Sequence, residues 1–221
     1  MKNNKFDSEE LEDLEFCLSE FEKKYKIRFT QDELNSIAGI EQLTETISNK
    51  FDYENSDDCT TQQAFYKLRN VLNKLNIGSQ SINRNTELTE LIPRKNRIQK
   101  VRDIEKELGF KLDVLRPKNI VKDLLIFLSL STLILAFYHF FYALILGICL
   151  YSVFDVIFKN GKEFKILTLG ELANKMVLNH YFNVRRNKNT INKIEFKNLV
   201  LEWFSDRMDM SKEELKSAKF I

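Results

Sequence analysis

The sequence has 221 residues, 43% hydrophobic and 30% charged, a composition that excludes a wholly disordered chain. Only six Gly and two Pro residues occur, which favours helices over a turn-rich β fold. The net charge of +2 argues against a nucleic-acid-binding protein, but the charge is unevenly placed. Residues 1–58 hold 16 acidic and 7 basic side chains, whereas residues 93–122 hold 10 basic and 4 acidic ones and residues 159–197 hold 9 basic and 3 acidic ones.

Residue types that commonly carry catalysis are sparse. The two histidines are 41 residues apart, and the sequence has no Gly-rich phosphate loop. Cys17, Cys59 and Cys149 form no CxxC pair, so neither a zinc ribbon nor a redox motif is supported. We therefore expect a protein that is not an enzyme and that holds no metal or cofactor.

Three helices are predicted in residues 1–54. Apolar residues at helical spacing predict the first over residues 8–24, and a short extended piece follows at 26–29. Thr30 and Glu33 form a capping-box pattern that begins a short second helix, which Gly39 ends. A third amphipathic helix begins at Ile40, and residues 55–61 are expected to form a linker with a helix cap at Thr60 or Thr61.

A further helix is predicted from Thr60 to Leu75, and another begins at Pro93, which fits a first helical position because it lacks an N–H. The start of that helix is basic, a placement that the helix dipole disfavours. Its basic residues are Arg94, Lys95, Arg97, Lys100 and Arg102. Anionic lipid headgroups or an acidic partner, including residues 1–58, would account for this cluster, and a solvated basic face is the alternative.

From Leu124 to Phe154 the chain has no Asp, Glu, Lys or Arg. One straight helix over residues 124–158 would span roughly 50 Å, well beyond a bilayer core of ~30 Å. A transmembrane hairpin over residues 119–162 fits better, with its turn at Tyr138, His139 and Tyr142, whose polar tips suit the headgroup interface. The alternatives are one span with an interfacial helix, and a re-entrant or buried soluble hairpin.

Both flanks of this segment are basic, which by the positive-inside rule predicts a multi-pass membrane protein with both termini cytoplasmic. The flanking basic residues are Arg116, Lys118, Lys122, Lys159 and Lys162. Asp155 lies four residues before Lys159, so we expect an ion pair on one helix face. No cleavable signal peptide is expected, because acidic residues and no apolar stretch follow Met1.

Two stretches resemble acyl carrier proteins. LEFCLSEFEKKYKIRFTQDELNSIAGIEQLTETISNKF is similar to the latter half of that family, and SINRNTELTELIPRKNRIQKVRDIEKELGFKL resembles its loop and second helix. Residues 166–177 look like the family's last helix, and residues 196–221 resemble another first helix. The resemblance implies a second module that is complete except for its short third helix, with the apolar hairpin in that place, so residues 60–112 should pack against residues 166–178.

The resemblance also implies where a phosphopantetheine serine would stand. That position falls at Arg94 in the second module and at Leu11 in the first, where Ser8 lies three residues earlier. Ser8 is thus the one weak candidate for a prosthetic group, and the modules otherwise lack the carrier serine.

We therefore predict an all-α fold of two small carrier-like helical modules, with a transmembrane helical hairpin inserted in the second. The expected divisions are a partial module (1–54), a linker (55–61), the first part of a second module (62–118), the hairpin (119–162), the last helix of that module (163–182) and a C-terminal helical segment (183–221).

Three functions follow as hypotheses. The first is a membrane-anchored protein that uses degenerate carrier-like modules to bind a protein partner at the cytoplasmic face. The second is a small membrane-active or pore-guarding hairpin of the toxin or immunity type, in which small residues such as Ala136, Ala143 and Gly147 allow close helix approach and a homo-oligomer. The third is an atypical carrier modified at Ser8.

Overall fold

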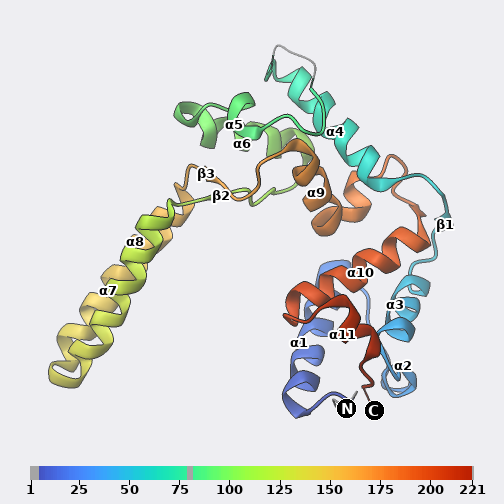
Figure 1. The fold of residues 1–221 in the computed structure, drawn as a ribbon, viewed down its shortest axis with the longest axis horizontal. Helices are drawn as coiled ribbons and strands as arrows, with labels where there is room; N and C mark the ends of the chain where they lie inside the picture. The colour runs from blue at the N-terminus through green and yellow to red at the C-terminus, as the bar shows by residue number, and fades with distance from the viewer. Residues whose placement is uncertain (1–4, 79–81, 221) are drawn as a thin grey trace. The chain divides into compact units, whose positions relative to one another are not determined.

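The structure is a computed structural model that describes residues 5–78 and 82–220. It is mostly helical, which confirms the all-α expectation at the level of secondary structure, and each strand in the described residues is two residues long. The chain divides into two compact units (Figure 1). Unit 1 combines residues 1–60 with residues 181–221, and unit 2 holds residues 61–180.

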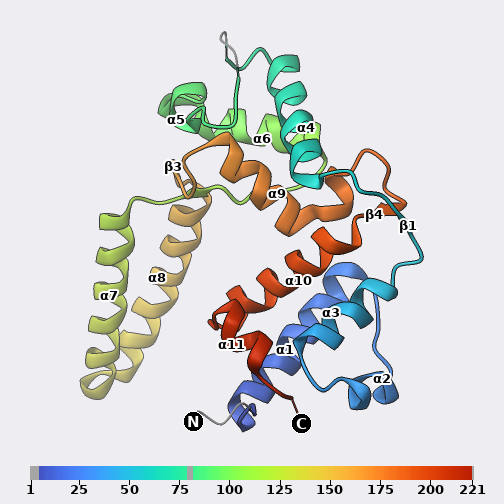
Figure 2. The same cartoon turned by 45° about the vertical axis from the view of Figure 1, so that its right-hand side comes forward.

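Unit 1 is built from helices contributed by both ends of the chain. Its elements are α1 (Ser8–Tyr25), α2 (Gln31–Ser36), α3 (Ile40–Asn49), β1 (Glu54–Asn55), β4 (Thr190–Ile191), α10 (Lys193–Arg207) and α11 (Lys212–Ser217). Figure 2 shows α10 and α11 beside α1 and α3. This differs from the division expected from the sequence, in which residues 183–221 stood apart. The reason is the buried face of α10, where Phe196, Val200 and Phe204 complete the core around Phe21 and Leu43.

Side-chain caps fix the starts of three helices in unit 1. The expected capping box at α2 is present, since Thr30 Oγ1 accepts a hydrogen bond from the N–H of Glu33 and the Glu33 carboxylate accepts one from the N–H of Thr30. Asp7 with Glu10 begins α1 in the same way, and Ser211 with Glu214 begins α11. The starts of these three helices are therefore specified by residues within one turn of each other.

The two ends of the described chain meet beside the start of α3. The N–H of Phe6 donates to the carbonyl of Lys219 at 3.0 Å, and the N–H of Phe220 donates to the carbonyl of Ala38 at 3.0 Å. The rings of Phe6 and Phe220 stack with centroids 5.1 Å apart, and both are buried. Unit 1 is thus closed by backbone pairing between its first and last segments.

Arg185 joins the two places where the chain leaves and re-enters unit 1. Its buried guanidinium donates to Thr60 Oγ1 at 2.6 Å and to the Tyr181 hydroxyl at 3.3 Å, and its Nε donates to Thr190 Oγ1 at 3.2 Å. A buried charge needs such partners to offset its desolvation. Arg185 therefore holds both crossing segments against β4.

Unit 2 contains the remaining helices and the apolar segment. Its elements are α4 (Thr60–Lys74), α5 (Leu88–Leu91), the 3-10 helix η1 (Arg94–Asn96), α6 (Arg97–Leu108), β2 (Leu115–Arg116), α7 (Asn119–Tyr138), α8 (Phe140–Lys159), β3 (Glu163–Phe164) and α9 (Leu169–Val184). Its core includes Leu68, Leu72, Ile104, Leu169 and Met176, all buried. Helix α9 is broken at His180, where φ is −139° and ψ is 39°, at the boundary of the unit.

Backbone hydrogen bonds connect the two halves of unit 2 across the apolar segment. The N–H of Leu88 donates to the carbonyl of Leu167 at 2.9 Å, and the N–H of Gly170 donates to the carbonyl of Arg84 at 2.8 Å. A Cβ at Gly170 would lie 3.0 Å from that oxygen, so the close approach favours glycine. The expected contact between residues 60–112 and 166–178 is therefore present.

The foot of the apolar segment is closed by a short antiparallel pair. Leu115 of β2 lies opposite Phe164 of β3, and Arg116 lies opposite Glu163. Gly161 sits directly against this pair, because a Cβ there would be 2.3 Å from the carbonyl carbon of Arg116. The chain thus leaves the rest of unit 2 for helices α7 and α8 and returns to it at one point.

In each unit, the turn that follows one helix is built in the same way, and we call this turn the glutamate joint. Helix α1 ends at Lys26, whose φ is +56°, and Glu22 Oε1 accepts a hydrogen bond from the N–H of Phe29 at 2.7 Å. Helix α6 ends at Gly109, whose φ is +81°, and Glu105 Oε1 accepts one from the N–H of Leu112 at 2.8 Å. In both units a glutamate four residues before the left-handed cap therefore fixes the extended segment that follows.

The units share a second feature, a backbone hydrogen bond to the segment just before a helix that follows the glutamate joint. In unit 1 Phe220 pairs with Ala38, just before α3, and in unit 2 Leu88 pairs with Leu167, just before α9. Between the glutamate joint and α3, unit 1 holds residues 30–39 with α2. Between the glutamate joint and α9, unit 2 holds residues 113–168 with the apolar segment.

Replacing Gly161 by Ala tests the closure at β2 and β3. The added methyl meets backbone atoms of Arg116 and Pro117, which cannot rotate away, so we expect local destabilisation by about 1–3 kcal/mol. Hydrogen exchange of the Lys165 amide, which donates to the carbonyl of Val114 at 2.8 Å, measures the effect in detergent micelles. Gly147→Ala is the matched control, since nothing lies within 4 Å of a Cβ there, and equal exchange in the two variants would contradict the assignment.

Replacing Tyr25 by Phe tests the core of unit 1. The Tyr25 hydroxyl is buried without a hydrogen-bond partner among residues 5–78 and 82–220, so its removal should raise the free energy of unfolding by about 1 kcal/mol. Burial also raises the pKa of this phenol, so the folded state keeps its proton above pH 10 while the unfolded state loses it. Stability therefore falls as pH rises above about 10, and less so in the variant.

The single tryptophan gives the readout for this change. Trp203 lies in unit 1 with its ring 5.3 Å from that of Phe21, so its fluorescence reports urea unfolding of this unit. Tyr181→Phe is the control, because that hydroxyl accepts a hydrogen bond from the N–H of Asn192 at 3.0 Å and should cost stability when removed. A Tyr25→Phe variant that unfolds as easily as Tyr181→Phe would refute the interpretation.

Candidate functional site

Helices α7 and α8 form an antiparallel pair, called here the hairpin (residues 119–159), whose outer surface is almost wholly apolar. Of the 25 exposed large hydrophobic side chains in the described residues, 21 lie between Ile120 and Phe158. Each helix has 20 residues and is long and apolar enough to cross a membrane. Only 11% and 6% of their most apolar 18 residues are buried, whereas an apolar core helix of a soluble protein is mostly buried.

The serine and threonine hydroxyls of the hairpin are satisfied within their own helices. Ser129 Oγ donates to the carbonyl of Leu125 at 2.9 Å, and Thr132 Oγ1 donates to that of Ser129 at 2.7 Å. The hydroxyls of Ser131 and Ser152 do the same toward carbonyls four residues earlier. Hydrocarbon offers no hydrogen-bond partners, so this arrangement removes the cost of placing these hydroxyls in lipid.

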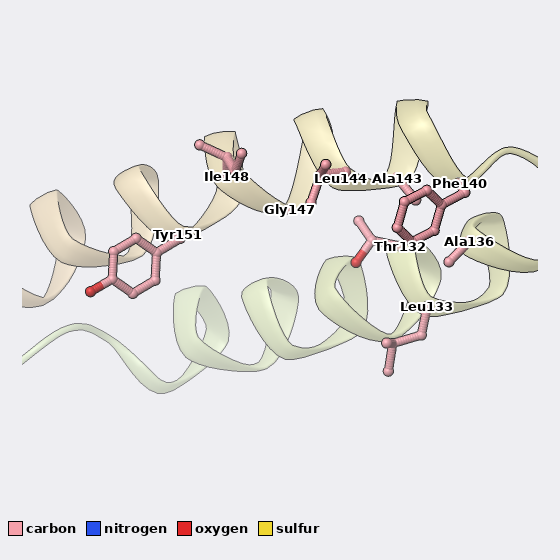
Figure 3. Close-up of a pocket in the computed structure, with 9 residues that line it drawn as sticks. All are labelled: Thr132, Leu133, Ala136, Phe140, Ala143, Leu144, Gly147, Ile148 and Tyr151. Atoms are coloured by element: carbon pink, nitrogen blue, oxygen red, sulfur yellow. The ribbon is translucent and has the colours of Figure 1, made fainter.

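Small side chains open a shallow groove of about 410 Å³ on one face of the hairpin (Figure 3). Thr132 and Ala136 contribute from α7, and Ala143 and Gly147 contribute from α8. Phe140 lies at one end of the groove and Tyr151 at the other. Such a surface permits close approach of another helix or of an acyl chain.

The tip of the hairpin carries aromatic residues with polar ends. His139 is the one residue between the two helices, with φ −146° and ψ 77°. Tyr138 and Tyr142, named with it from the sequence, lie on either side, and the His139 and Tyr142 rings are 5.9 Å apart. Phe137 at the same level is 92% exposed. This composition is typical of a membrane–water interface.

The foot of the hairpin is basic. Lys118 precedes the first turn of α7, Lys122 follows in that turn, and Arg116 lies in β2, all exposed. Lys159 ends α8 and pairs with Asp155 Oδ2 at 2.6 Å, as expected, and Lys162 is exposed just before β3. These five residues, from the two flanks of the apolar segment, are thus brought to one end of the hairpin.

The basic cluster at the start of α6 divides into two kinds of side chain. Lys95 is exposed, Lys100 is half-buried, and Arg94 pairs with Glu163 Oε1 at 3.0 Å. Arg97, predicted from sequence to belong to the same basic surface, is instead only 5% exposed. Its Nε donates to the carbonyl of Ile92 at 3.1 Å and its Nη1 to the carbonyl of Lys162, while burial lowers its pKa.

Arg97 therefore has a structural role that the sequence pattern did not predict. Its guanidinium lies over the Phe164 ring, 4.4 Å from the centroid, and 3.9 Å from Glu163. It connects α6 to β3 and so supports the foot of the hairpin. A buried side chain of this kind does not reach lipid headgroups, which leaves the exposed residues of the cluster as candidates.

Ser8 is the exposed first residue of α1, directly after the cap residue Asp7. The cysteines differ in environment, because Cys17 is buried in unit 1 while Cys59 and Cys149 are exposed. Burial, with a smaller contribution from the charge of Glu20, raises the pKa of the Cys17 thiol to about 11, so little reactive thiolate forms at neutral pH.

No family model, no curated protein and no solved structure matches this chain.

Proposed function

We propose that this chain is a membrane protein whose hairpin crosses the bilayer twice and whose two helical units bind another protein at the cytoplasmic face. The observation that most directly supports the membrane crossing is the exposed apolar surface of α7 and α8. Each helix of 20 residues is about 30 Å long at ~1.5 Å per residue, the thickness of a bilayer core of ~30 Å.

The orientation rests on the charges at the two ends of the hairpin. Basic residues gather at the foot, and aromatic residues with polar ends gather at the tip. Basic loops remain on the cytoplasmic side during insertion, so the foot and both units belong there, and the tip faces outward. The anionic lipids of the inner leaflet also favour this orientation.

A binding role for the units is favoured by their repeated construction. The shared glutamate joint and the shared pairing before α3 and α9 support two copies of one module, with unit 1 assembled in a circularly permuted order. The resemblance to acyl carrier proteins implies helices that dock onto partner proteins. A module without the carrier serine would carry no prosthetic group but would still recognise a partner protein.

The site for a partner should include exposed apolar residues on the units themselves. Phe16 on α1 is 64% exposed, on a helix of the kind that the resemblance implies can dock onto a partner. A photo-crosslinker in place of Phe16 should capture one discrete membrane-associated protein, and Phe16→Asp should abolish its copurification. A crosslinker in place of the exposed Glu15, about 100° around the same helix, is the control, and identical capture from both positions would contradict a specific surface.

Cysteine labelling tests the membrane topology. With a membrane-impermeant maleimide, Cys59 should react in inside-out vesicles. A variant that combines Cys59→Ser with His139→Cys should react only in right-side-out vesicles. Cys149, near the middle of α8, should stay unlabelled until the chain is denatured. Buried Cys17 provides an internal control for folding.

Alkaline carbonate extraction complements the labelling. A spanning hairpin stays with the membrane pellet, whereas a peripheral or soluble protein is released. Release into the supernatant, or labelling of Cys59 and position 139 from the same side, would refute two crossings.

The carrier hypothesis makes a separate prediction about mass. After coexpression with a phosphopantetheinyl transferase we expect the intact mass of the chain to be unchanged, because the modules lack the carrier serine. A gain equal to one phosphopantetheine that disappears in Ser8→Ala would instead establish an atypical carrier. The Ser211→Ala variant, which also changes a serine at the start of a helix, is the matched control.

A membrane-active hairpin is the second candidate function, favoured by the groove of small residues on α7 and α8. Reconstitution into dye-loaded liposomes separates the two candidates. The anchored binding protein should release no dye at ratios where the chain is fully inserted, whereas a pore-forming hairpin should empty the vesicles.

A further inference from the structure

A pocket of about 530 Å³ lies where the foot of the hairpin meets α6. We call it the basal pocket, and its lining includes Arg102, Glu105, Lys111, Val114, Phe158 and Lys165. Ligand pockets commonly have volumes of ~300–1,000 Å³, so a lipid headgroup with part of a chain is of the right size. Its walls come from α6, from residues 111–115 and from the end of α8.

Basic side chains dominate the charge of the basal pocket. Arg102, Lys111, Lys159 and Lys165 line it, against the two acids Glu105 and Asp113. Lys111 is neutralised by Glu105 at 3.0 Å, and Lys159 pairs with Asp155. Within residues 5–78 and 82–220, Arg102 and Lys165 have no carboxylate at ion-pair distance, so the pocket retains a net positive charge that Asp113 offsets only in part.

A neighbouring lysine indicates the same excess of positive charge. Lys175 donates from Nζ to the carbonyl of Asp113 at 2.7 Å, which places it beside the pocket. Burial lowers the pKa of Lys175 and the charge of Lys165 lowers it further, while Asp113 opposes the shift. A bound anion would relieve this repulsion between the two lysines.

The other wall of the basal pocket is apolar and continues into the hairpin. Val114 and Leu115 line it from the segment around β2, and Phe158 lines it from the last turn of α8, where it is 46% exposed. If α8 crosses the bilayer, Phe158 lies at the edge of the hydrocarbon and Lys159 at headgroup depth. The pocket thus presents cations and an apolar wall at the level where phospholipids change from headgroup to chain.

We propose that the basal pocket binds one anionic phospholipid of the cytoplasmic leaflet, with its phosphate between Arg102 and Lys165 and an acyl chain against Phe158. This inference rests on the proposed membrane crossing. It adds to that proposal a specific lipid site, in place of diffuse attraction between the basic foot and the membrane.

Native mass spectrometry of the full chain tests the site. The chain is released from micelles that contain equal amounts of phosphatidylglycerol and phosphatidylcholine. We expect one phosphatidylglycerol to be retained in preference to phosphatidylcholine. The double variant Arg102→Gln, Lys165→Gln should lower that retention about tenfold or more, since each basic side chain near an anionic headgroup contributes to its binding.

The matched control is the double variant Arg84→Gln, Lys106→Gln. It removes the same charge from exposed positions of unit 2 that neither line the basal pocket nor belong to the basic foot of the hairpin. Retention at the level of the unchanged chain supports a built site. An equal loss in both double variants overturns it and leaves only diffuse electrostatic attraction.

Two further outcomes are informative. If glycerol 3-phosphate in equimolar amount displaces the retained lipid, the site recognises a free phosphate and the proposed phospholipid is wrong. Alkaline carbonate extraction of the same preparation tests the membrane crossing separately from the lipid site. A chain that remains in the membrane pellet but shows no preference for phosphatidylglycerol refutes the pocket alone, and a chain that is released refutes the membrane crossing and the pocket together.

Discussion

The structure depends first on the cost of leaving the surface of α7 and α8 in water. Twenty-one exposed large hydrophobic side chains lie between Ile120 and Phe158. At roughly 1.5 kcal/mol for each side chain removed from water, their burial is worth on the order of 30 kcal/mol. This exceeds the typical net stability of a folded domain, about 5–15 kcal/mol. Lipid, or an equally extensive protein surface, is therefore needed for this conformation of the hairpin.

That constraint explains the construction at the foot of the hairpin. A long segment disturbs the rest of its unit least when it leaves and returns at adjacent points, which the β2–β3 pair provides. Gly161 allows the two strands to approach, and buried Arg97 connects β3 to α6. The two ends of the hairpin are therefore held together by backbone pairing and by the contact of Arg97 with Lys162.

Much of the local structure follows from the sequence, because its causes are local. The capping box of Thr30 and Glu33, the pair of Asp155 and Lys159, and the apolar helices each depend on residues a few positions apart. The assembly of α10 with α1 and α3 was not predicted, because an amphipathic helix does not specify which partner covers its apolar face. Arg97 was misplaced for a similar reason, since its burial depends on the distant carbonyl of Lys162.

The assembly of unit 1 from both ends of the chain also determines the order in which the protein can mature. During translation α1 to α3 leave the ribosome first, with Leu43 and Ile47 still lacking the helix that covers them. Helices α4 to α6 emerge next and the hairpin follows them, so the hairpin is complete before α10 has been synthesised. The proposed membrane insertion would therefore begin before the core of unit 1 is complete, and a nascent chain that stalls before residue 193 would present an unfinished apolar face to cellular chaperones.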